Sequence, residues 1–339
     1  GDDWWGEKER WTGIMHGHEL YNVGHLYEAA VAHFQATGKR TLLDVALRNA
    51  DLVVRTFGTE GRVAVPGHEE IEIGLVKLYR VTGDTAYLNT ARFFVDERGV
   101  GTGRELLGTY HQDHKPVREQ REAVGHAVRA GYLYSAMADL AAITGNTNYL
   151  PALHSIWEDI VYRKMYITGG VGARRSGESF GDPYELPNAT AYAETCAAIA
   201  MVLWNHRMFL MTGEGRYYDV LERTLYNGLI SGVSQSGDRF FYPNPLASDG
   251  KTPFNFGSAT RQPWFPCACC PSNISRILPS VPAYFYAVRG DTVYVNLYAS
   301  GTANPETGFG NLRLTQETDY PWKGDVRLTV MVDDPADFT

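Results

Sequence analysis

The amino-acid sequence predicts a mainly α-helical fold, a toroid of helical hairpins, followed by the start of a β-domain. Three observations support this prediction. Apolar residues recur with a period near that of a helix over most of residues 11–286, the dipeptide Thr-Gly recurs between these segments, and strand-like alternation begins near Arg289. The chain has 339 residues, of which 44% are hydrophobic, so it can bury a core of the size that such a fold needs.

The clearest helical segments are residues 18–35, 68–81 and 127–143, where apolar side chains share one face. A further helix is predicted over residues 271–287. It opens with Pro271, and proline is suited to the first turn of a helix because its missing N–H would have no intrahelical partner. The two cysteines before this proline are therefore expected at the helix N-terminus.

Thr-Gly pairs mark the ends of the predicted helices, and an aromatic or leucine side chain opens the next helix a few residues later. Glycine is suited to this place because it adopts the left-handed conformation that closes a helix. The uneven spacing of the pairs favours a toroid with long loops over a regular solenoid. The pairs are Thr37-Gly38, Thr82-Gly83, Thr144-Gly145 and Thr212-Gly213.

Two long loops interrupt the helical pattern, at residues 168–188 and 231–266. Long loops inside a compact domain usually carry function. Beyond Arg289, alternating polar and apolar residues predict strands within residues 291–301, 309–322 and 324–332. We therefore divide the chain into a helical domain, residues 1–287, and the beginning of a β-domain, residues 288–339.

Cysteines are unusually clustered in this chain. Cys267, Cys269 and Cys270 lie within four residues, and the fourth cysteine, Cys196, follows Glu194 by two positions. Adjacent cysteines cannot easily form a disulfide because their Cβ vectors diverge, so a shared metal ion explains the cluster better. Zinc takes four N, S or O ligands, and three thiolates with the Glu194 carboxylate would complete such a set.

The approach of the chain to this predicted zinc site can also be derived. Residues two apart on a regular helix point in very different directions, so Glu194 and Cys196 could not share one ion there. We expect an irregular or extended segment over residues 188–194 and a helix that begins near Cys196. Four-coordinate thiolate-rich sites are typically structural, yet a helical core of this size needs no metal to be stable. The ligand count alone leaves both roles open.

Charge and hydropathy exclude some classes of partner. The net charge of −8 gives no electrostatic reason to expect nucleic acid or an anionic membrane surface. No apolar run is long enough to span a bilayer. Cysteines without paired spacing indicate reduced thiols and a cytoplasmic location. The first residues lack a signal-peptide pattern and an initiator Met, so we expect that the natural N-terminus lies before Gly1.

Several motifs together resemble one known family. The segments ESFGDPYELPN, AYAETCAAIAM and WFPCACCPSNISR, with GHELYNVGHLYEAA and AVGHAVRAGYLY before them, are similar to the bacterial β-L-arabinofuranosidases of glycoside hydrolase family 127. The resemblance covers essentially the whole chain. It implies an (α/α)6 barrel that is incomplete at its N-terminal side here, followed by a β-sandwich that would continue beyond Thr339. It also implies a retaining exo-glycosidase that releases terminal β-L-arabinofuranose.

The same resemblance implies roles for individual residues. The nucleophile would be Cys269 and the acid/base Glu178. The Zn2+ ligands would be Glu194, Cys196, Cys269 and Cys270. The sugar-contacting residues would be His18, His68, His126 and Tyr242. A small oligosaccharide or glycan is the expected substrate, and a homodimer is one assembly that we consider.

Reasoning from the residues alone leaves alternatives open. Asp182 and Glu185 share the loop of Glu178 and compete with it for the acid role. Cys267 is expected next to the metal ligands or as a buried thiol. The histidines at 16 and 25 are expected to be structural. An apolar platform for a sugar, or ordinary packing, is expected for Tyr192, Trp264 and Phe265.

Three other functions compete with the first. A hydrolase of a related furanose-like sugar would keep the same mechanism. A non-catalytic α/α sugar-binding protein would use the zinc as a structural ion. Another toroid enzyme, such as a sugar epimerase or a lyase, is the third, but its chemistry gives no reason for a thiolate cluster.

Overall fold

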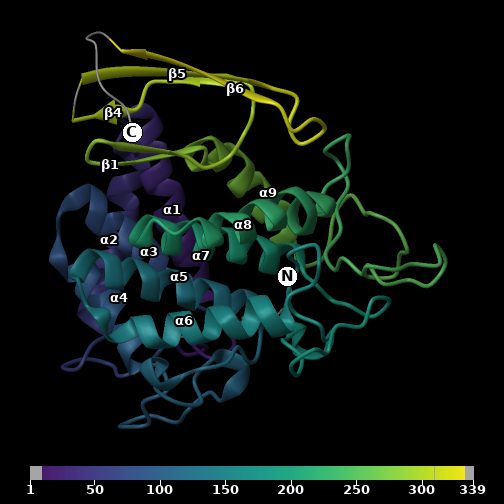
Figure 1. The fold of residues 1–339 in the computed structure, drawn as a ribbon. Coiled ribbons are helices and arrows are strands. Elements are labelled where there is room, and N and C mark those ends of the chain that lie inside the picture. Colours follow the sequence, from purple (N-terminus) through teal and green to yellow (C-terminus); the bar gives the residue numbers. More distant parts are fainter. Residues whose placement is uncertain (1–9, 309, 333–339) are drawn as a thin grey trace. The chain divides into compact units, whose positions relative to one another are not determined.

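The computed structural model describes residues 10–308 and 310–332, which form two compact units. The first unit extends to Pro271 and the second begins at Ser272. The division falls within helix α9 (Cys269–Ile277). The first unit is helical and the second contains the strands (Figure 1).

The prediction of a mainly helical chain is confirmed. The α-helices of the first unit are α1 (Glu19–Thr37), α2 (Thr41–Thr56), α3 (Ile71–Thr82), α4 (Thr85–Glu97), α5 (Ala127–Thr144), α6 (Leu150–Asp159), α7 (Thr195–Thr212) and α8 (Gly215–Arg223). Short 3-10 or π turns are η2 (Thr109–His111), η3 (Val117–Glu119), η4 (Thr147–Tyr149), η5 (Ile160–Lys164), η6 (Ser176–Glu178), η7 (Thr224–Leu229) and η8 (Ile230–Gly232). None of these described helices is both long and apolar enough to cross a membrane.

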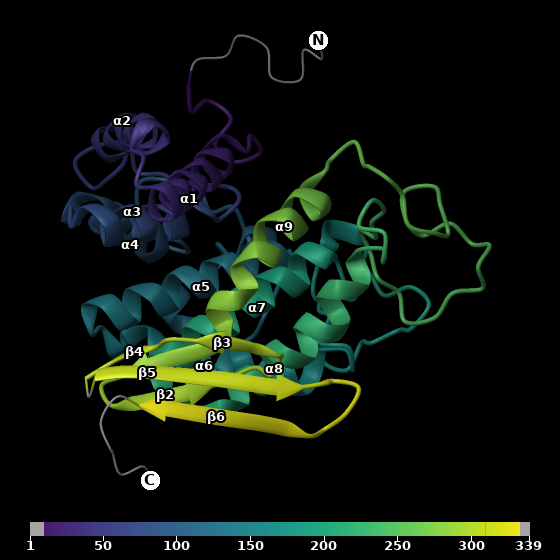
Figure 2. The ribbon, with the colours of Figure 1, turned by 90° about the horizontal axis from the view of Figure 1, so that it is seen from above.

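The helices of the first unit form inner and outer members of hairpins. Helices α1, α3, α5 and α7 pack against one another in that order, and each also packs against the helix that follows it in the chain. Figure 2 shows α5 and α7 side by side. These two helices are buried around most of their circumference, whereas α2 buries only one stripe. This is the hairpin arrangement that the sequence predicts.

Each inner helix ends in the same Thr-Gly turn. The glycines Gly38, Gly83, Gly145 and Gly213 have φ of 69°, 74°, 68° and 76°, the left-handed conformation that was predicted for them. The threonine has its own role. In every turn its hydroxyl donates to the carbonyl four residues earlier and accepts from the amide two residues later. The side chain therefore satisfies one carbonyl of the last turn and fixes the first residues of the connection.

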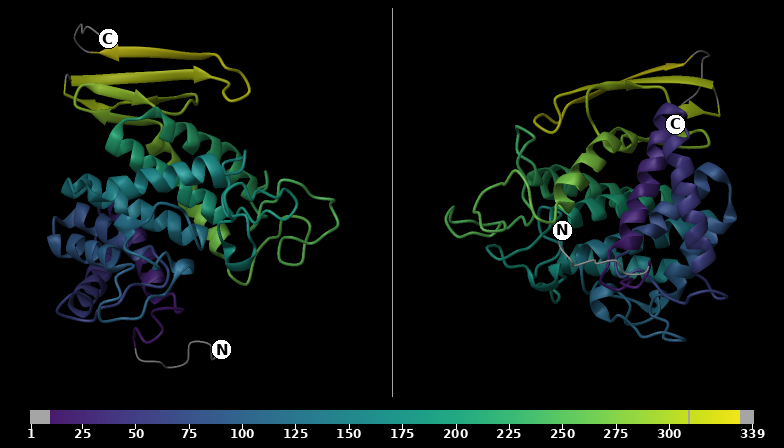
Figure 3. Two further views of the ribbon diagram at one scale, coloured as in Figure 1. Left: turned by 60° about the horizontal axis from the view of Figure 1, so that its bottom comes forward. Right: turned by 180° about the vertical axis from the view of Figure 1, so that it is seen from behind.

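The two long loops lie side by side at one end of the helices (Figure 3). The amide of Leu246 donates to the carbonyl of Asn188 at 2.9 Å, and the amide of Asn244 donates to the carbonyl of Tyr192 at 2.9 Å. The segment that precedes α7 is therefore held by the second loop.

Two predicted helices have different ends in the structure. Helix α3 begins at Ile71 rather than 68, because Glu70 has a non-helical backbone (φ 165°, ψ −39°). The helix predicted over residues 271–287 ends at Ile277 and continues as the 3-10 segment η9 (Leu278–Tyr284). Pro279 and Pro282 cannot donate the backbone hydrogen bonds that an α-helix needs.

The second unit contains antiparallel strands, as the alternation predicts. They are β1 (Tyr286–Arg289), β2 (Thr292–Val295), β3 (Gly301–Ala303), β4 (Glu306–Thr307), β5 (Gly310–Thr318) and β6 (Val326–Val332). Strand β1 pairs with β2, and β5 pairs with β3, β4 and β6. Strand β5 buries alternate side chains, at Leu312, Leu314 and Gln316, so one face of this sheet is apolar.

Candidate metal and catalytic site

Four potential metal ligands converge where α7 and α9 begin. Glu194 precedes α7 with an extended backbone (φ −60°, ψ 140°), and the helix starts at Thr195, as predicted. Helix α9 starts at Cys269, so two more cysteines enter from its first turn. One ligand atom from each of Glu194, Cys196, Cys269 and Cys270 lies within 4.8 Å of all the others.

The distances within this group suit one shared ion. The sulfur atoms of Cys196 and Cys270 are 3.4 Å apart, and Oε1 of Glu194 is 3.6 Å from the sulfur of Cys270 and 3.8 Å from that of Cys269. None of the four cysteines forms a disulfide. Cys196 and Cys270 are buried, whereas Cys269 is partly exposed. A ligand from outside can therefore reach the sulfur of Cys269 and neither of the other two.

The charge of the group calls for a cation. Burial, the Cys269 thiol and Glu178 raise the pKa of Glu194, and burial raises the pKa of Cys270. Among the described residues no lysine or arginine forms an ion pair with Glu194, whose Oε2 is buried without a hydrogen-bond partner. Three thiols and a carboxylate with an unsatisfied oxygen fit a borderline-soft divalent metal.

Tyr242 joins the exposed cysteine to the second long loop. Its hydroxyl is 2.9 Å from the sulfur of Cys269. Its backbone amide donates to the side chain of Asn255 at 3.0 Å, and its ring packs edge-on against Phe265 at 5.6 Å between centroids. The predicted sugar contact Tyr242 thus lies directly beside the predicted nucleophile.

Glu178 lies on the other side of Glu194. Oxygen atoms of these two carboxylates and a nitrogen of His126 lie within 4.8 Å of one another. The Nε2 atom of His126 is 2.9 Å from Oε2 of Glu178, and the hydroxyl of Tyr192 donates to Oε1 at 2.7 Å. Burial alone would raise the pKa of Glu178, but the bonds from His126 and Tyr192 lower it, so the substrate-free carboxylate is ionised at neutral pH.

The other two acids of this loop are engaged elsewhere. Arg174 binds Asp182 with 2.9 Å between Nη2 and Oδ2, and Glu185 with 2.9 Å between Nε and Oε1. The hydrogen bonds from Arg174 lower the pKa of Glu185 to about 2. Glu178 lies beside the candidate metal ligand Glu194, whereas Asp182 and Glu185 are paired with Arg174, so the geometry favours Glu178 for the acid role.

Two of the predicted sugar-binding histidines have opposite tautomers. His126 precedes α5, and its Nδ1 accepts the backbone amides of Val128 and Arg129 at 3.2 Å each, so its hydrogen is on Nε2 and points at Glu178. The Nδ1 of His68 donates to the carbonyl of Glu69 at 2.8 Å, which leaves Nε2 as an acceptor. Burial lowers the pKa of both imidazoles, so both are neutral.

His18 completes a row of imidazoles. Ring centroids of His18 and His68 are 5.7 Å apart, and those of His68 and His126 are 5.5 Å apart. Tyr21, which the sequence analysis missed, packs against His68 at 4.3 Å, and nearby cysteine sulfurs contribute to its raised pKa, after burial. Its position three residues after His18 on α1 puts both side chains on one helix face, which is the signal that could have found it.

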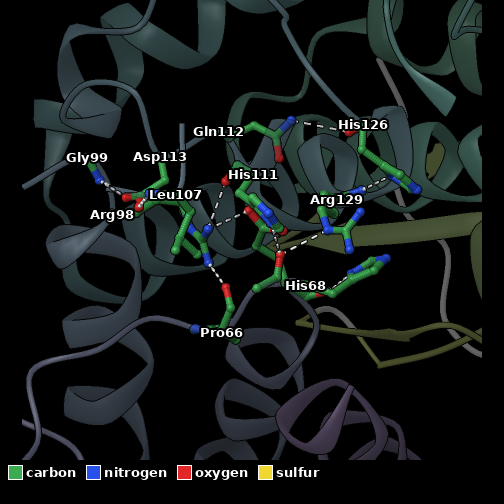
Figure 4. A network of polar contacts seen from close by, with 12 residues as sticks. Pro66, His68, Arg98, Gly99, Leu107, His111, Gln112, Asp113, His126 and Arg129 are labelled. Carbon is green, nitrogen blue, oxygen red and sulfur yellow. Dashed lines mark hydrogen bonds and ion pairs between the residues drawn. The ribbon is translucent and has the colours of Figure 1, made fainter. Parts of the chain in front are cut away.

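A buried polar network supports these histidines (Figure 4). The carbonyl of Gly67 accepts from Nε of Arg129 at 2.9 Å and from Nδ1 of His111 at 2.7 Å. The amide of Gly67 donates to the carbonyl of Ile14 at 2.9 Å, so the segments that carry His18 and His68 are joined by backbone. Arg129 also lowers the pKa of His68, after burial.

The remaining candidates have simpler roles. His25 pairs with Glu70 at 3.0 Å, and the ring of His16 lies 6.4 Å from that of His111. Cys267 is exposed, so the expectation of a buried thiol is wrong; a hydrogen bond with Cys269 raises its pKa. Phe265 is 2% exposed and is a packing residue, whereas Trp264 is 62% exposed.

The chain thus combines a fold of helical hairpins with a thiol-carboxylate centre beside a second carboxylate, and comparison with known families identifies its class. Residues 2–283 match the GH127 catalytic domain of β-L-arabinofuranosidase, and residues 292–339 match the GH127 middle domain. The chain therefore belongs to the GH127 family of glycoside hydrolases.

Individual relatives agree with this assignment. A non-reducing end β-L-arabinofuranosidase of Bifidobacterium longum subsp. longum is 38% identical over 99% of this chain and 54% of its own length. A solved GH127 β-arabinofuranosidase is 56% identical, with a TM-score of 0.90 over 96% of this chain and 50% of that one. A GH127 β-L-arabinofuranosidase from Geobacillus stearothermophilus T6 is 45% identical, with a TM-score of 0.90 over 96% and 55%.

The chain spans about half the length of these relatives. A cellobiose 2-epimerase from Bacillus thermoamylovorans has a TM-score of 0.52 at 12% identity over 78% of this chain and 71% of its own, which shows a likeness of fold alone.

Proposed function

We propose that this protein is a retaining exo-glycosidase that hydrolyses terminal β-L-arabinofuranosides in small oligosaccharides or glycans. One observation carries the proposal: of the three cysteines that share the candidate metal site, Cys269 alone is partly exposed, and the carboxylate of Glu178 lies across Glu194 from it. A reachable thiolate with a carboxylate nearby is the pair that double displacement at a sugar requires. The names of the relatives at 38% to 56% identity support the sugar.

We propose zinc as the metal and Glu194, Cys196, Cys269 and Cys270 as its ligands. A bound zinc ion would keep the thiols deprotonated at neutral pH and offset the buried carboxylate. This thiolate-rich donor set disfavours magnesium or calcium, which prefer oxygen ligands.

The chain's own residues would perform a double displacement. The sulfur of Cys269 forms a bond to the anomeric carbon while the bond from that carbon to the leaving oxygen breaks. Glu178, which is ionised in the free protein and takes up a proton when the substrate binds, gives this proton to the leaving oxygen. Ionised Glu178 then takes a proton from water, whose oxygen attacks the anomeric carbon as the carbon–sulfur bond breaks. Two inversions give net retention.

The histidines and Tyr242 would hold the sugar. Neutral His68 offers an acceptor at Nε2 to a sugar hydroxyl, whereas His126 gives its Nε2 hydrogen to Glu178 and would contact the sugar beside that carboxylate. His18 at the edge of the row and the hydroxyl of Tyr242 beside the sulfur complete the set. These contacts would orient the anomeric carbon toward Cys269.

The architecture that we propose is an (α/α)6 barrel over residues 1–287 followed by a β-sandwich that starts at residue 288. The hairpins of α1 to α8 and the antiparallel strands of the second unit support it. Cytoplasmic location and a homodimer stay predictions.

The test uses the full-length, metal-loaded protein and an L-arabinofuranose-configured bromoacetamide, followed by peptide mass spectrometry. We expect one adduct, on the sulfur of Cys269. We also expect that Glu178→Gln keeps its metal and fold but loses kcat by about 100-fold or more, since general acid–base catalysis contributes that much.

Asp182→Asn is the matched control, because it neutralises an exposed carboxylate of the same loop, 81% exposed, and should retain activity. An adduct on a carboxylate, or unchanged turnover in Glu178→Gln, would contradict the proposal. A protein that binds arabinose and metal but turns over no arabinofuranoside would be a sugar-binding protein with a structural zinc.

A further inference from the structure

Phe256 is an exposed aromatic residue one ring away from the candidate nucleophile. Its side chain is 42% exposed, and its ring centroid lies 4.9 Å from that of Tyr242, whose hydroxyl contacts Cys269. Its ring also packs against buried Phe265 at 5.6 Å. Phe256 therefore presents an apolar face to solvent at the edge of the site.

The backbone at Phe256 is strained. Its φ is 49°, a conformation that is rare for bulky residues. Among the described residues, Glu178 (φ 49°) and Ala193 (φ 40°) are also non-glycine residues at positive φ. Ala193 directly precedes Glu194. Strain of this kind persists where the surroundings enforce it, and it is common at functional sites.

A rigid turn enforces this conformation. Asn255 is fully buried and donates from Nδ2 to the carbonyls of Phe240 at 3.1 Å and Thr260 at 2.9 Å. Gln262 donates from Nε2 to the carbonyl of Phe256 at 3.1 Å. The ring of Phe256 is thus fixed before any ligand arrives, so little conformational entropy would be lost on binding.

Arg175 connects Phe256 to the turn that carries Glu178. Its guanidinium carbon lies 5.9 Å from the centroid of the Phe256 ring, and its Nη1 donates to the carbonyl of Phe254 at 2.9 Å. The amide of Glu178 donates to the carbonyl of Arg175 at 3.1 Å within η6. The turn that carries the proton donor is therefore joined through Arg175 to the turn that carries Phe256.

We propose that Phe256 and Arg175 form the subsite for the leaving group, and that this group is a sugar residue of the glycan. The inference rests on the proposed function, because the leaving oxygen is the atom that Glu178 protonates. Aromatic rings bind the apolar C–H face of a sugar, and a guanidinium donates to its hydroxyls. The subsite makes the protein favour glycans over small alkyl arabinofuranosides.

The test compares two substrates of the full-length, metal-loaded protein: a β-L-arabinofuranosyl disaccharide and methyl β-L-arabinofuranoside, whose methyl group is too small to reach Phe256. We expect Phe256→Ala to lower kcat/KM roughly tenfold for the disaccharide, mainly through KM, and to leave the methyl glycoside within about twofold. Phe256→Trp, which keeps an aromatic face, should retain the preference for the disaccharide.

Tyr184→Ala is the matched control, because Tyr184 is also aromatic, 72% exposed and at positive φ (66°), but in the other long loop. This substitution should leave kcat/KM unchanged for both substrates. Equal losses on both substrates in Phe256→Ala, or no loss on either, would overturn the subsite.

Binding separates this proposal from the proposed function. In Glu178→Gln protein, calorimetry should show that Phe256→Ala weakens disaccharide binding about tenfold and leaves free L-arabinose unchanged. This difference in binding would support the subsite even if the wild-type protein cleaved neither substrate. Absence of cleavage would contradict the proposed function but not the subsite. Equal binding of the disaccharide with and without Phe256 would sink the subsite alone.

Discussion

The helical unit buries two groups of charged side chains, and they are balanced in different ways. Around Arg98, which is fully buried, Glu69 and Glu72 are paired with a guanidinium supplied by the chain itself. Around Glu194, the described residues provide thiols and a second carboxylate but no paired lysine or arginine. The comparison teaches that the first group carries its own positive charge as folded, whereas among the described residues no lysine or arginine is paired with Glu194 in the second.

The Arg98 group uses both terminal nitrogens of the guanidinium to join distant segments (Figure 4). Nη1 donates to the carbonyl of His111 and Nη2 to the carbonyl of Pro66, both at 2.8 Å. Nη1 is also 3.1 Å from Oε1 of Glu69. Arg98 therefore fixes the backbone on either side of His68 without touching the sugar-binding row itself.

Protonation completes the balance in this group. Two buried carboxylates share one guanidinium, and burial raises the pKa of Glu69 to about 8 despite the favourable charge of Arg98. At neutral pH Glu69 therefore holds a proton, and one positive charge faces one negative charge. Burial also raises the pKa of Glu194 and Cys270 in the thiol group, but among the described residues no lysine or arginine is paired with Glu194.

Removal of a metal ligand should give the largest effect. Cys270→Ala leaves three ligands, so we expect purified protein with little metal and a loss of turnover greater than about 100-fold. Metal content by mass spectrometry and arabinofuranosidase activity check this. Cys267→Ala is the control, because that exposed cysteine lies outside the ligand set. A fully metal-loaded, active Cys270→Ala protein would break the comparison.

Removal of the guanidinium should have the next largest effect, on stability. Arg98→Met leaves buried carboxylates without their partner, which costs about 3–5 kcal/mol of unfolding free energy. Urea unfolding checks this, with Arg118→Met as control. Arg118 pairs with Asp96 at the surface, where its side chain is 43% exposed, so its loss should cost less than about 1 kcal/mol. Similar losses in both variants would mean that the buried group carries no special stability.

The effect of Glu69→Gln should be confined to the dependence of stability on pH. Because the folded pKa of Glu69, about 8, is above its ordinary 4.5, its contribution to stability is complete below pH 4.5 and is lost as pH rises to 8. The variant lacks this loss. From pH 5 to 8 the free energy of unfolding of the wild type should therefore fall relative to that of the variant, and above pH 8 the difference between them should stay level. Urea unfolding at several pH values measures it.

Much of the metal group was predictable from the sequence, because its evidence is local. Adjacent cysteines before Pro271 placed two ligands at a helix start, and the two-residue spacing of Glu194 and Cys196 required an extended entry. The Thr-Gly turns were also predictable, since a left-handed cap depends on neighbouring residues. The start of α3 was not, because the non-helical backbone before it is held by distant partners, among them Arg98.

The choice among the acids of the first long loop could not come from the sequence either. Glu178, Asp182 and Glu185 differ in their partners, His126 and Tyr192 for the first and Arg174 for the other two. These partners lie far apart in the chain or point in directions that residue spacing does not determine. Phe256 gave no signal at all, since its conformation depends on the turn that surrounds it.

The backbone junction at Gly67 has a consequence for how this protein can change over generations. A Cβ atom at position 67 would overlap the carbonyl of Met15, so a side chain there would push apart the segments that bear His18 and His68. The distance between these two imidazoles thus depends on Gly67, which has no side chain that could contact a substrate. In a saturation mutagenesis library selected for growth on arabinofuranosides, position 67 should be as intolerant as the positions of Cys196, Cys269 and Cys270.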